Sequence, residues 1–161
     1  MIPKGFGENE EDIINLEVKR KEDVVLIGKE IQSFCKKKNI DSKRGYYAAL
    51  SMEEMASNIL EHGFTKDNKK HKIDVRVMLK DDDIIMRIKD DCVPFNPQKW
   101  HEMTSTGTDP TKNVGIRLVY GIADEVEYRS MLGMNVLTIV VAAHNLKESR
   151  NRAAGAAGTT G

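Results

Sequence analysis

The stretch from Ile73 to Asp90, IDVRVMLKDDDIIMRIKD, decides the fold. Apolar and polar residues alternate on both sides of its centre, which is the pattern of strands that bury one face. The acidic run Asp81-Asp82-Asp83 is typical of a hairpin turn between them. The alternation also carries Asp90 onto the buried face, where a carboxylate requires a hydrogen-bond donor. The alternating apolar residues are Ile73, Val75, Val77 and Leu79, then Ile84, Met86 and Ile88.

Two helices and a strand are expected before this hairpin. From Glu22 to about Lys37, apolar residues recur at helical spacing, with acids in the first turn and lysines in the last, which suits the helix dipole. A second amphipathic helix is expected from Lys43 to Glu61, stopped by Gly63. Residues 13–18 alternate in the manner of an edge strand.

The chain after the hairpin begins with a long irregular segment. Residues 91–112 hold three of the four prolines and no repeating apolar pattern, which is typical of a functional lid or a disordered segment. A short helix is expected over 113–123, and a second hairpin over 126–131 and 134–141. The order of elements predicts an α+β fold, with helices on one face of a mixed, mostly antiparallel sheet.

Composition limits the domain count and the class of function. The length of 161 residues predicts one domain, placed at 12–145 between flexible segments at 1–11 and 146–161. The 25 Lys and Arg balance 25 Asp and Glu, which disfavours direct nucleic-acid binding. The sequence has no apolar run of membrane-spanning length and no signal-peptide core, so we expect a cytoplasmic protein without membrane contact.

Cysteine and histidine placement favours ordinary structural roles. Cys35 and Cys92 share no ligand or disulfide spacing and are expected to be reduced and buried. The histidines lie far apart in sequence, which argues against a cluster of metal-binding histidines. These residues are His62, His71, His101 and His144.

The second helix carries the first candidate for chemistry. At 100° per residue, Ser51, Glu54, Asn58 and His62 form one polar stripe beside the apolar face. The Glu54 carboxylate can take a proton, and the amide oxygen of Asn58 suits Mg²⁺. A solvated polar face explains the same residues when the helix is considered alone.

Two further candidates border the long segment at 91–112. Asp90 could accept a hydrogen bond from the amino group of a ligand, or it could cap its own turn. At the far end, a helix that begins near Asn113 offers free backbone N–H groups to phosphate. Asn113 tolerates left-handed backbone angles, and Gly115 permits close approach.

Taken in order, these pieces resemble the Bergerat-type, histidine-kinase-like ATP-binding domain, most closely the anti-sigma-factor serine-protein kinases. Residues 54–63 match the family's E-x-x-x-N-x-x-x-H-G box, 90–97 resemble D-x-G-x-x-F-D-P, and 113–118 resemble the second glycine box. The likeness covers roughly residues 12–142. The departures are Cys92 and Asn113 in place of glycines, Asn96 in place of Asp, and Met134-Asn135 in place of threonines.

The resemblance implies a two-layer α/β sandwich that binds ATP and Mg²⁺. Asp90 would accept from the adenine amino group, Asn58 would hold Mg²⁺, and the amides of Val114 and Gly115 would bind phosphate. The usual adenine-linked hydroxyl would be replaced by Asn135 or, equally, by Thr138. The other implied nucleotide-binding residues are His62, Phe95, Asn113, Ile116 and Arg117.

The resemblance also implies a reaction and partners. Glu54 would act as the general base, while Lys112 and Arg117 would neutralise charge on the γ-phosphate.

One hypothesis is a serine/threonine kinase that phosphorylates an anti-anti-sigma-like antagonist. The alternative is a nucleotide-gated module that sequesters a sigma factor with little or no kinase activity. A third is a regulatory ATPase module that acts within or beside a larger membrane or phosphatase signalling protein. The family likeness suggests a homodimer.

Overall fold

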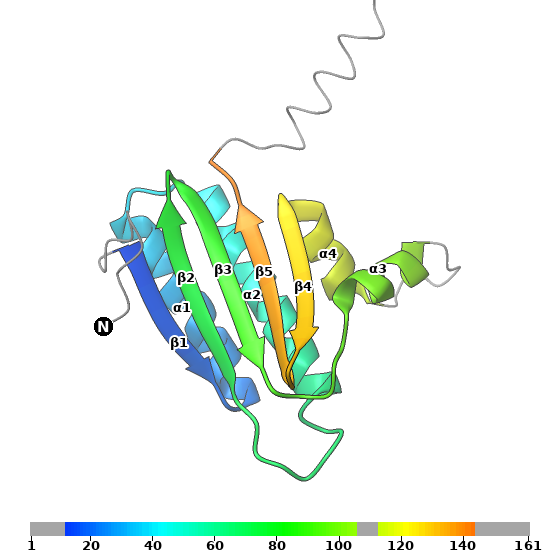
Figure 1. The fold of residues 1–161 in the computed structure, drawn as a ribbon. Coiled ribbons are helices and arrows are strands. Elements are labelled where there is room, and N and C mark those ends of the chain that lie inside the picture. The colour runs from blue at the N-terminus through cyan, green and yellow to red at the C-terminus, as the bar shows by residue number, and fades with distance from the viewer. Residues whose placement is uncertain (1–11, 106–112, 144–161) are drawn as a thin grey trace, which may run out of the picture.

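The computed structural model describes residues 12–105 and 113–143, which form a sheet with helices packed on one face (Figure 1). The expected α+β fold is confirmed, whereas the expectations for residues 1–11 and 146–161 concern parts of the chain outside the described residues. The elements are β1 (Ile13–Val18), α1 (Lys21–Lys37), α2 (Ser42–His62), β2 (Ile73–Lys80), β3 (Asp83–Asp90), α3 (Pro97–Ser105), α4 (Val114–Ile122), β4 (Glu125–Met131) and β5 (Met134–Val141).

The sheet has five strands in the order β1-β2-β3-β5-β4. All four pairings among these strands are antiparallel. In this register Asp90 pairs with Ile73 of β2 on one side and with Asn135 of β5 on the other. The end of β3 is therefore enclosed by two neighbours, which positions the candidate residues described below.

The core lies between the sheet and the layer of α1, α2 and α4 (Figure 1). Residues at alternate positions of β2, β3 and β5 point into it, as the sequence pattern predicts. Burying a side chain the size of Val or Ile contributes about 1.5–3 kcal/mol, so the alternation determines which face of the sheet the helices cover. The largest fully buried side chains include Ile31, Met52, Met55, Ile73, Met86, Ile88 and Ile139.

One helix lies where the sequence predicts an irregular segment. Helix α3 occupies Pro97–Ser105, so the expectation of an irregular segment is wrong for those residues, whereas the lid at 91–112 stays a prediction. Asn96 Oδ1 accepts from the Gln98 backbone N–H at 3.0 Å, and Pro97 starts the helix, as is common in the first helical position. None of the helices in the described ranges is both long and apolar enough to cross a bilayer.

Candidate functional site

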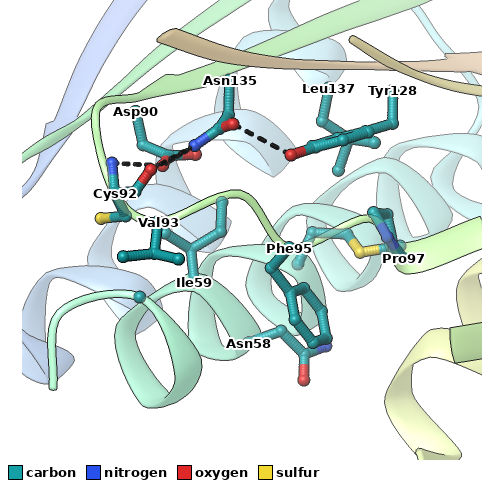
Figure 2. A pocket seen from close by; sticks show the side chains of 12 residues that line it. Asn58, Ile59, Asp90, Cys92, Val93, Phe95, Pro97, Tyr128, Asn135 and Leu137 are labelled. Carbon is teal, nitrogen blue, oxygen red and sulfur yellow. Dashed lines mark hydrogen bonds between the residues drawn. The ribbon is translucent and has the colours of Figure 1, made fainter. Parts of the chain in front are cut away.

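A pocket opens at the end of the sheet where β3 leaves it (Figure 2). It lies between α2, the segment that joins β3 to α3, and the strands β4 and β5. Its empty volume is about 410 Å³ when the solvent at its mouth is included. Of the residues expected to bind nucleotide, four line this pocket. These are Asn58, Asp90, Phe95 and Asn135.

The floor of the pocket is a buried hydrogen-bond network centred on Asp90. Asp90 Oδ1 accepts from the Cys92 backbone N–H and from Asn135 Nδ2, both at 2.9 Å. Asn135 Nδ2 also donates to the Cys92 carbonyl at 2.8 Å, and the Tyr128 hydroxyl donates to Asn135 Oδ1 at 2.9 Å (Figure 2). Burial raises the pKa of Tyr128, which keeps this hydroxyl protonated. The network holds the Asp90 carboxylate in one orientation.

One oxygen of Asp90 accepts none of these N–H bonds. Among the described residues, the N–H groups that bond to Asp90 all reach Oδ1. A buried carboxylate oxygen favours a donor, so Oδ2 suits the amino group of a bound molecule. The walls next to it are apolar and include Ile59, Val93 and Leu137. A flat, mostly apolar group with one amino substituent would satisfy both features.

Asn135 and Thr138 lie on opposite faces of the sheet. Asn135 is 3% exposed and faces the pocket. Thr138 points to the opposite face of the sheet, where it lies beside Arg87 and Glu127. Both amide hydrogens of Asn135 are already used, by Asp90 and by the Cys92 carbonyl. The geometry therefore makes Asn135 a support for Asp90.

The polar stripe of α2 runs from this pocket toward α4. Asn58 Nδ2 donates to the Glu54 carbonyl at 2.9 Å, so its amide oxygen points outward from the helix (Figure 2). His62 stacks on Phe95 with ring centroids 4.8 Å apart, and Trp100 of α3 packs against both rings. The aromatic contacts hold the end of the segment that joins β3 to α3, and α3 itself, against the end of α2.

Glu54 meets the first turn of α4. A Cβ added to Gly115 would overlap the Glu54 carboxylate, so glycine is what allows the two helices to approach here. Asn113 adopts the left-handed conformation at the start of α4, with φ 53° and ψ 39°. Within the described residues its side chain makes no capping bond, so the N–H groups of this turn are not used by a cap. An acceptor such as phosphate can therefore bind beside Glu54.

The remaining candidates lie around this turn. Val114 is exposed, Ile116 is buried in the core side of α4, and Arg117 is half-buried one residue further on. Lys112 lies outside the described residues, so its proposed place near the phosphates is still a prediction from the sequence.

Comparison with known proteins agrees with this geometry. Residues 18–141 match the histidine kinase-like ATPase domain family. The chain belongs to this family. Among curated proteins, none shows significant similarity to the sequence.

Two solved structures show the same fold. One contains the RsbU and RsbW domains of Rv1364c from Mycobacterium tuberculosis, with a TM-score of 0.54 and 14% identity over 79% of this chain and 32% of that one. The other is the histidine kinase domain from the Erythrobacter litoralis EL346 blue-light activated histidine kinase, with a TM-score of 0.51 and 14% identity over 81% and 63% of the two chains. The present chain thus spans less than two thirds of each neighbour.

In this histidine kinase-like ATPase domain, Cys92 is the residue that the sequence resemblance places at a box glycine. Both cysteines are free and buried, as expected. A Cβ on Gly63 would come within 2.8 Å of the Cβ of Cys92, so the absence of a side chain at Gly63 makes room for the cysteine. Burial, and then the charge of Asp90, raise the pKa of the Cys92 thiol to about 12.

A cluster behind Cys92 is not evident from the sequence. The two ring nitrogens of His71 lie 2.7 Å from Asp91 Oδ1 and 2.6 Å from Asp67 Oδ1. Asp67 is four residues from His71, whereas Asp91 is twenty residues away. Ile73 pairs with Asp90, which brings the chain just before β2 next to the chain just after β3. The hydrogen bonds to Asp91 and then Asp67 raise the pKa of His71. The pairing register of β2 and β3 would have indicated this cluster, but hydrophobic alternation alone does not determine that register.

Proposed function

We propose that this ATPase domain binds ATP with Mg²⁺ and transfers the γ-phosphoryl group to a serine of a partner protein. The observation that carries the proposal is the alignment of the Asp90 pocket and the Glu54–Gly115 contact along one face of α2. Asn58 joins them, because it lines the pocket and bonds to the Glu54 carbonyl. Residues 54 and 62 are separated by roughly 12 Å along the helix, so one extended ligand can reach both ends.

The nucleotide would bind with its base in the pocket. Asp90 Oδ2 would accept from the adenine amino group, between the apolar side chains of Ile59 and Leu137. Asn135 would act through Asp90 and would not itself touch the base.

The phosphates would extend toward α4. The amides of Val114 and Gly115 would donate to phosphate oxygens at the positive end of the helix. The outward oxygen of Asn58 fits Mg²⁺, because the amide nitrogen is already bound to Glu54 and a hard cation prefers oxygen. When bound, Mg²⁺ would offset the negative charge of the phosphates.

Glu54 would supply the base. Its carboxylate would take the proton of the serine hydroxyl as the hydroxyl oxygen bonds to the γ-phosphorus. The bond from the γ-phosphorus to the bridging oxygen would break in the same displacement, and ADP would leave. Arg117, and Lys112 from the sequence prediction, would neutralise charge on the transferred group.

Glu54→Gln tests the reaction, because it keeps the shape of the side chain and removes the base. We expect phosphoryl transfer from radiolabelled Mg·ATP to a purified anti-anti-sigma-like antagonist to fall by about 10²–10⁴-fold. Mg·ATP affinity, measured by calorimetry, should change little. Glu53→Gln is the matched control, because Glu53 packs against Gly28 of α1 and should leave transfer intact. Unchanged transfer in Glu54→Gln would overturn the assignment of the base.

A second function is favoured by the two glycine departures. Cys92 and Asn113 stand where the family has glycines in the two boxes that contact nucleotide. A domain altered there could bind ATP and sequester a sigma factor with little transfer. Wild-type protein that captures a purified sigma factor only with Mg·ATP present, and transfers no phosphate to the antagonist, would favour this function.

A further inference from the structure

We propose that His71, Asp91 and Cys92 form a binding site for a thiophilic divalent cation such as Zn²⁺, behind the nucleotide pocket. The donor atoms of these residues all lie within 4.8 Å of one another. The side chain of His71 is 3% exposed and Cys92 is 5% exposed, whereas the side chain of Asp91 is 52% exposed, so two buried ligands meet one at the surface.

The 4.8 Å limit on the distances between donor atoms is wider than in a tetrahedral zinc site, so the ligands would move together on binding. Zn–S and Zn–N bonds of about 2.3 and 2.0 Å place neighbouring ligand atoms about 3.5 Å apart. His71 Nδ1 and Asp91 Oδ1 are 2.7 Å apart in the described structure, a contact that they make through a shared proton. A cation that replaces this proton would increase the distance between the two atoms by less than about 1 Å. Rotation of the side chains can supply this movement.

Asp67 completes the arrangement. It lies 2.6 Å from His71 Nε2, the ring nitrogen that faces away from Asp91. Metal-binding histidines commonly donate their second ring N–H to a carboxylate, which fixes the tautomer and the ring orientation. Asp67 would hold Nε2 protonated and leave the Nδ1 lone pair for the metal.

The charge around the site favours a cation. Asp67, Asp90 and Asp91 place negative charge around the Cys92 thiol. On binding, the cation would displace the proton of the thiol and any proton on His71 Nδ1 to solvent, with no change of oxidation state. Thiolate and imidazole select Zn²⁺ over Mg²⁺, which separates this site from the Mg²⁺ position proposed at Asn58. Three protein ligands leave the fourth position for water.

The site would act on the pocket through Cys92. The Cys92 N–H donates to Asp90 Oδ1, so a metal on the sulfur would anchor the residue that orients the Asp90 carboxylate. Figure 2 shows the sulfur and this N–H on the same outer side of the pocket.

Cobalt substitution tests the proposal. Untagged, chelator-treated protein free of nucleotide would be titrated with Co²⁺ and then with Zn²⁺. We expect an equimolar Co²⁺ complex with a sulfur-to-cobalt absorption band in the near ultraviolet, abolished by Zn²⁺. Cys92→Ser should remove the band, and Asp67→Asn should weaken Zn²⁺ binding by about 10–100-fold. Cys35→Ser, which changes the other buried thiol, should leave the absorption band and the Zn²⁺ affinity unchanged.

Two outcomes would overturn the proposal. Wild-type protein with no cobalt–sulfur band would mean that His71 only links the two carboxylates. A band that survives in Cys92→Ser and disappears in Cys35→Ser would place the metal elsewhere. If circular dichroism shows that Cys92→Ser does not fold, the Asp67→Asn variant decides between the outcomes, because Asp67 is half-exposed. Unchanged Zn²⁺ affinity in Asp67→Asn would count against the site. Because nucleotide is absent, failure here leaves the proposed kinase function untouched.

Discussion

The two ends of the polar face of α2 are built by different kinds of contact. At the Asp90 end, strand register fixes the site, because Asp90 and Asn135 face each other across paired strands and bond directly. At the Glu54 end, one helix packs on another, and a glycine provides the space for the carboxylate. The first end is a buried hydrogen-bond network, whereas the second depends on a single close approach.

This difference predicts different consequences of mutation. Removing a partner from the Asp90 network leaves a buried polar group unsatisfied, so affinity and stability should fall together. Changing the packing at Glu54 moves the end of a flexible side chain, so stability should be kept while chemistry is lost. The predictions below test that separation, from the largest effect to the smallest.

Gly115→Ala should have the largest effect. The new Cβ would overlap the Glu54 carboxylate, which can rotate away at little cost because it is the end of its side chain. Misplacing the base by about 1 Å costs about 10²-fold in rate, so we expect phosphoryl transfer to fall by that factor. The midpoint of urea unfolding should stay the same or rise, because alanine favours the helix.

Gly121→Ala in the same helix is the control. Apart from its chain neighbours and the backbone of its own helix, no atom of the described residues lies within 4 Å of a Cβ placed there. It should gain helix propensity and keep full transfer. Equal activity losses in the two variants would show that helix α4, and not the Glu54 contact, is responsible.

Asn135→Ala should affect both affinity and stability. It removes two donors from the Asp90 and Cys92 acceptors and one acceptor from Tyr128. We expect a loss of about 2 kcal/mol in the free energy of unfolding and at least about tenfold weaker Mg·ATP binding. Urea denaturation and calorimetry measure the two quantities.

Thr138→Ala is the matched control on the same strand. Thr138 lies on the opposite face of the sheet. The free energies of unfolding and of Mg·ATP binding should therefore each change by less than about 0.5 kcal/mol. If Asn135→Ala loses stability and keeps full Mg·ATP affinity, Asp90 does not bind the nucleotide.

The fold and the Asp90 end follow largely from the sequence. Alternation in Ile73–Asp90 determines which face is buried, and it placed Asp90 correctly because a strand has a period of two residues. The same rule left Asn135 and Thr138 open, since the register of β5 against β3 is set by contacts distant in sequence.

Two features escaped sequence reasoning for physical reasons. Helix α3 is short and contributes few residues to the core, so it has no strong periodic signal, although Asn96-Pro97 is a recognisable helix start. The His71 cluster joins residues about twenty positions apart in sequence, and only the pairing of β2 with β3 brings them together.

Ser51→Ala should have the smallest effect, and of opposite sign. Ser51 lies in the same stripe, one turn before Glu54, but it is fully buried and its hydroxyl has no hydrogen-bond partner among the described residues. Removing a buried unsatisfied hydroxyl should raise the free energy of unfolding by about 1 kcal/mol. Transfer and Mg·ATP affinity should be unchanged, because the proposed functional part of the stripe begins at Glu54. A loss of activity in Ser51→Ala would extend the Glu54 end of the site one turn deeper into α2.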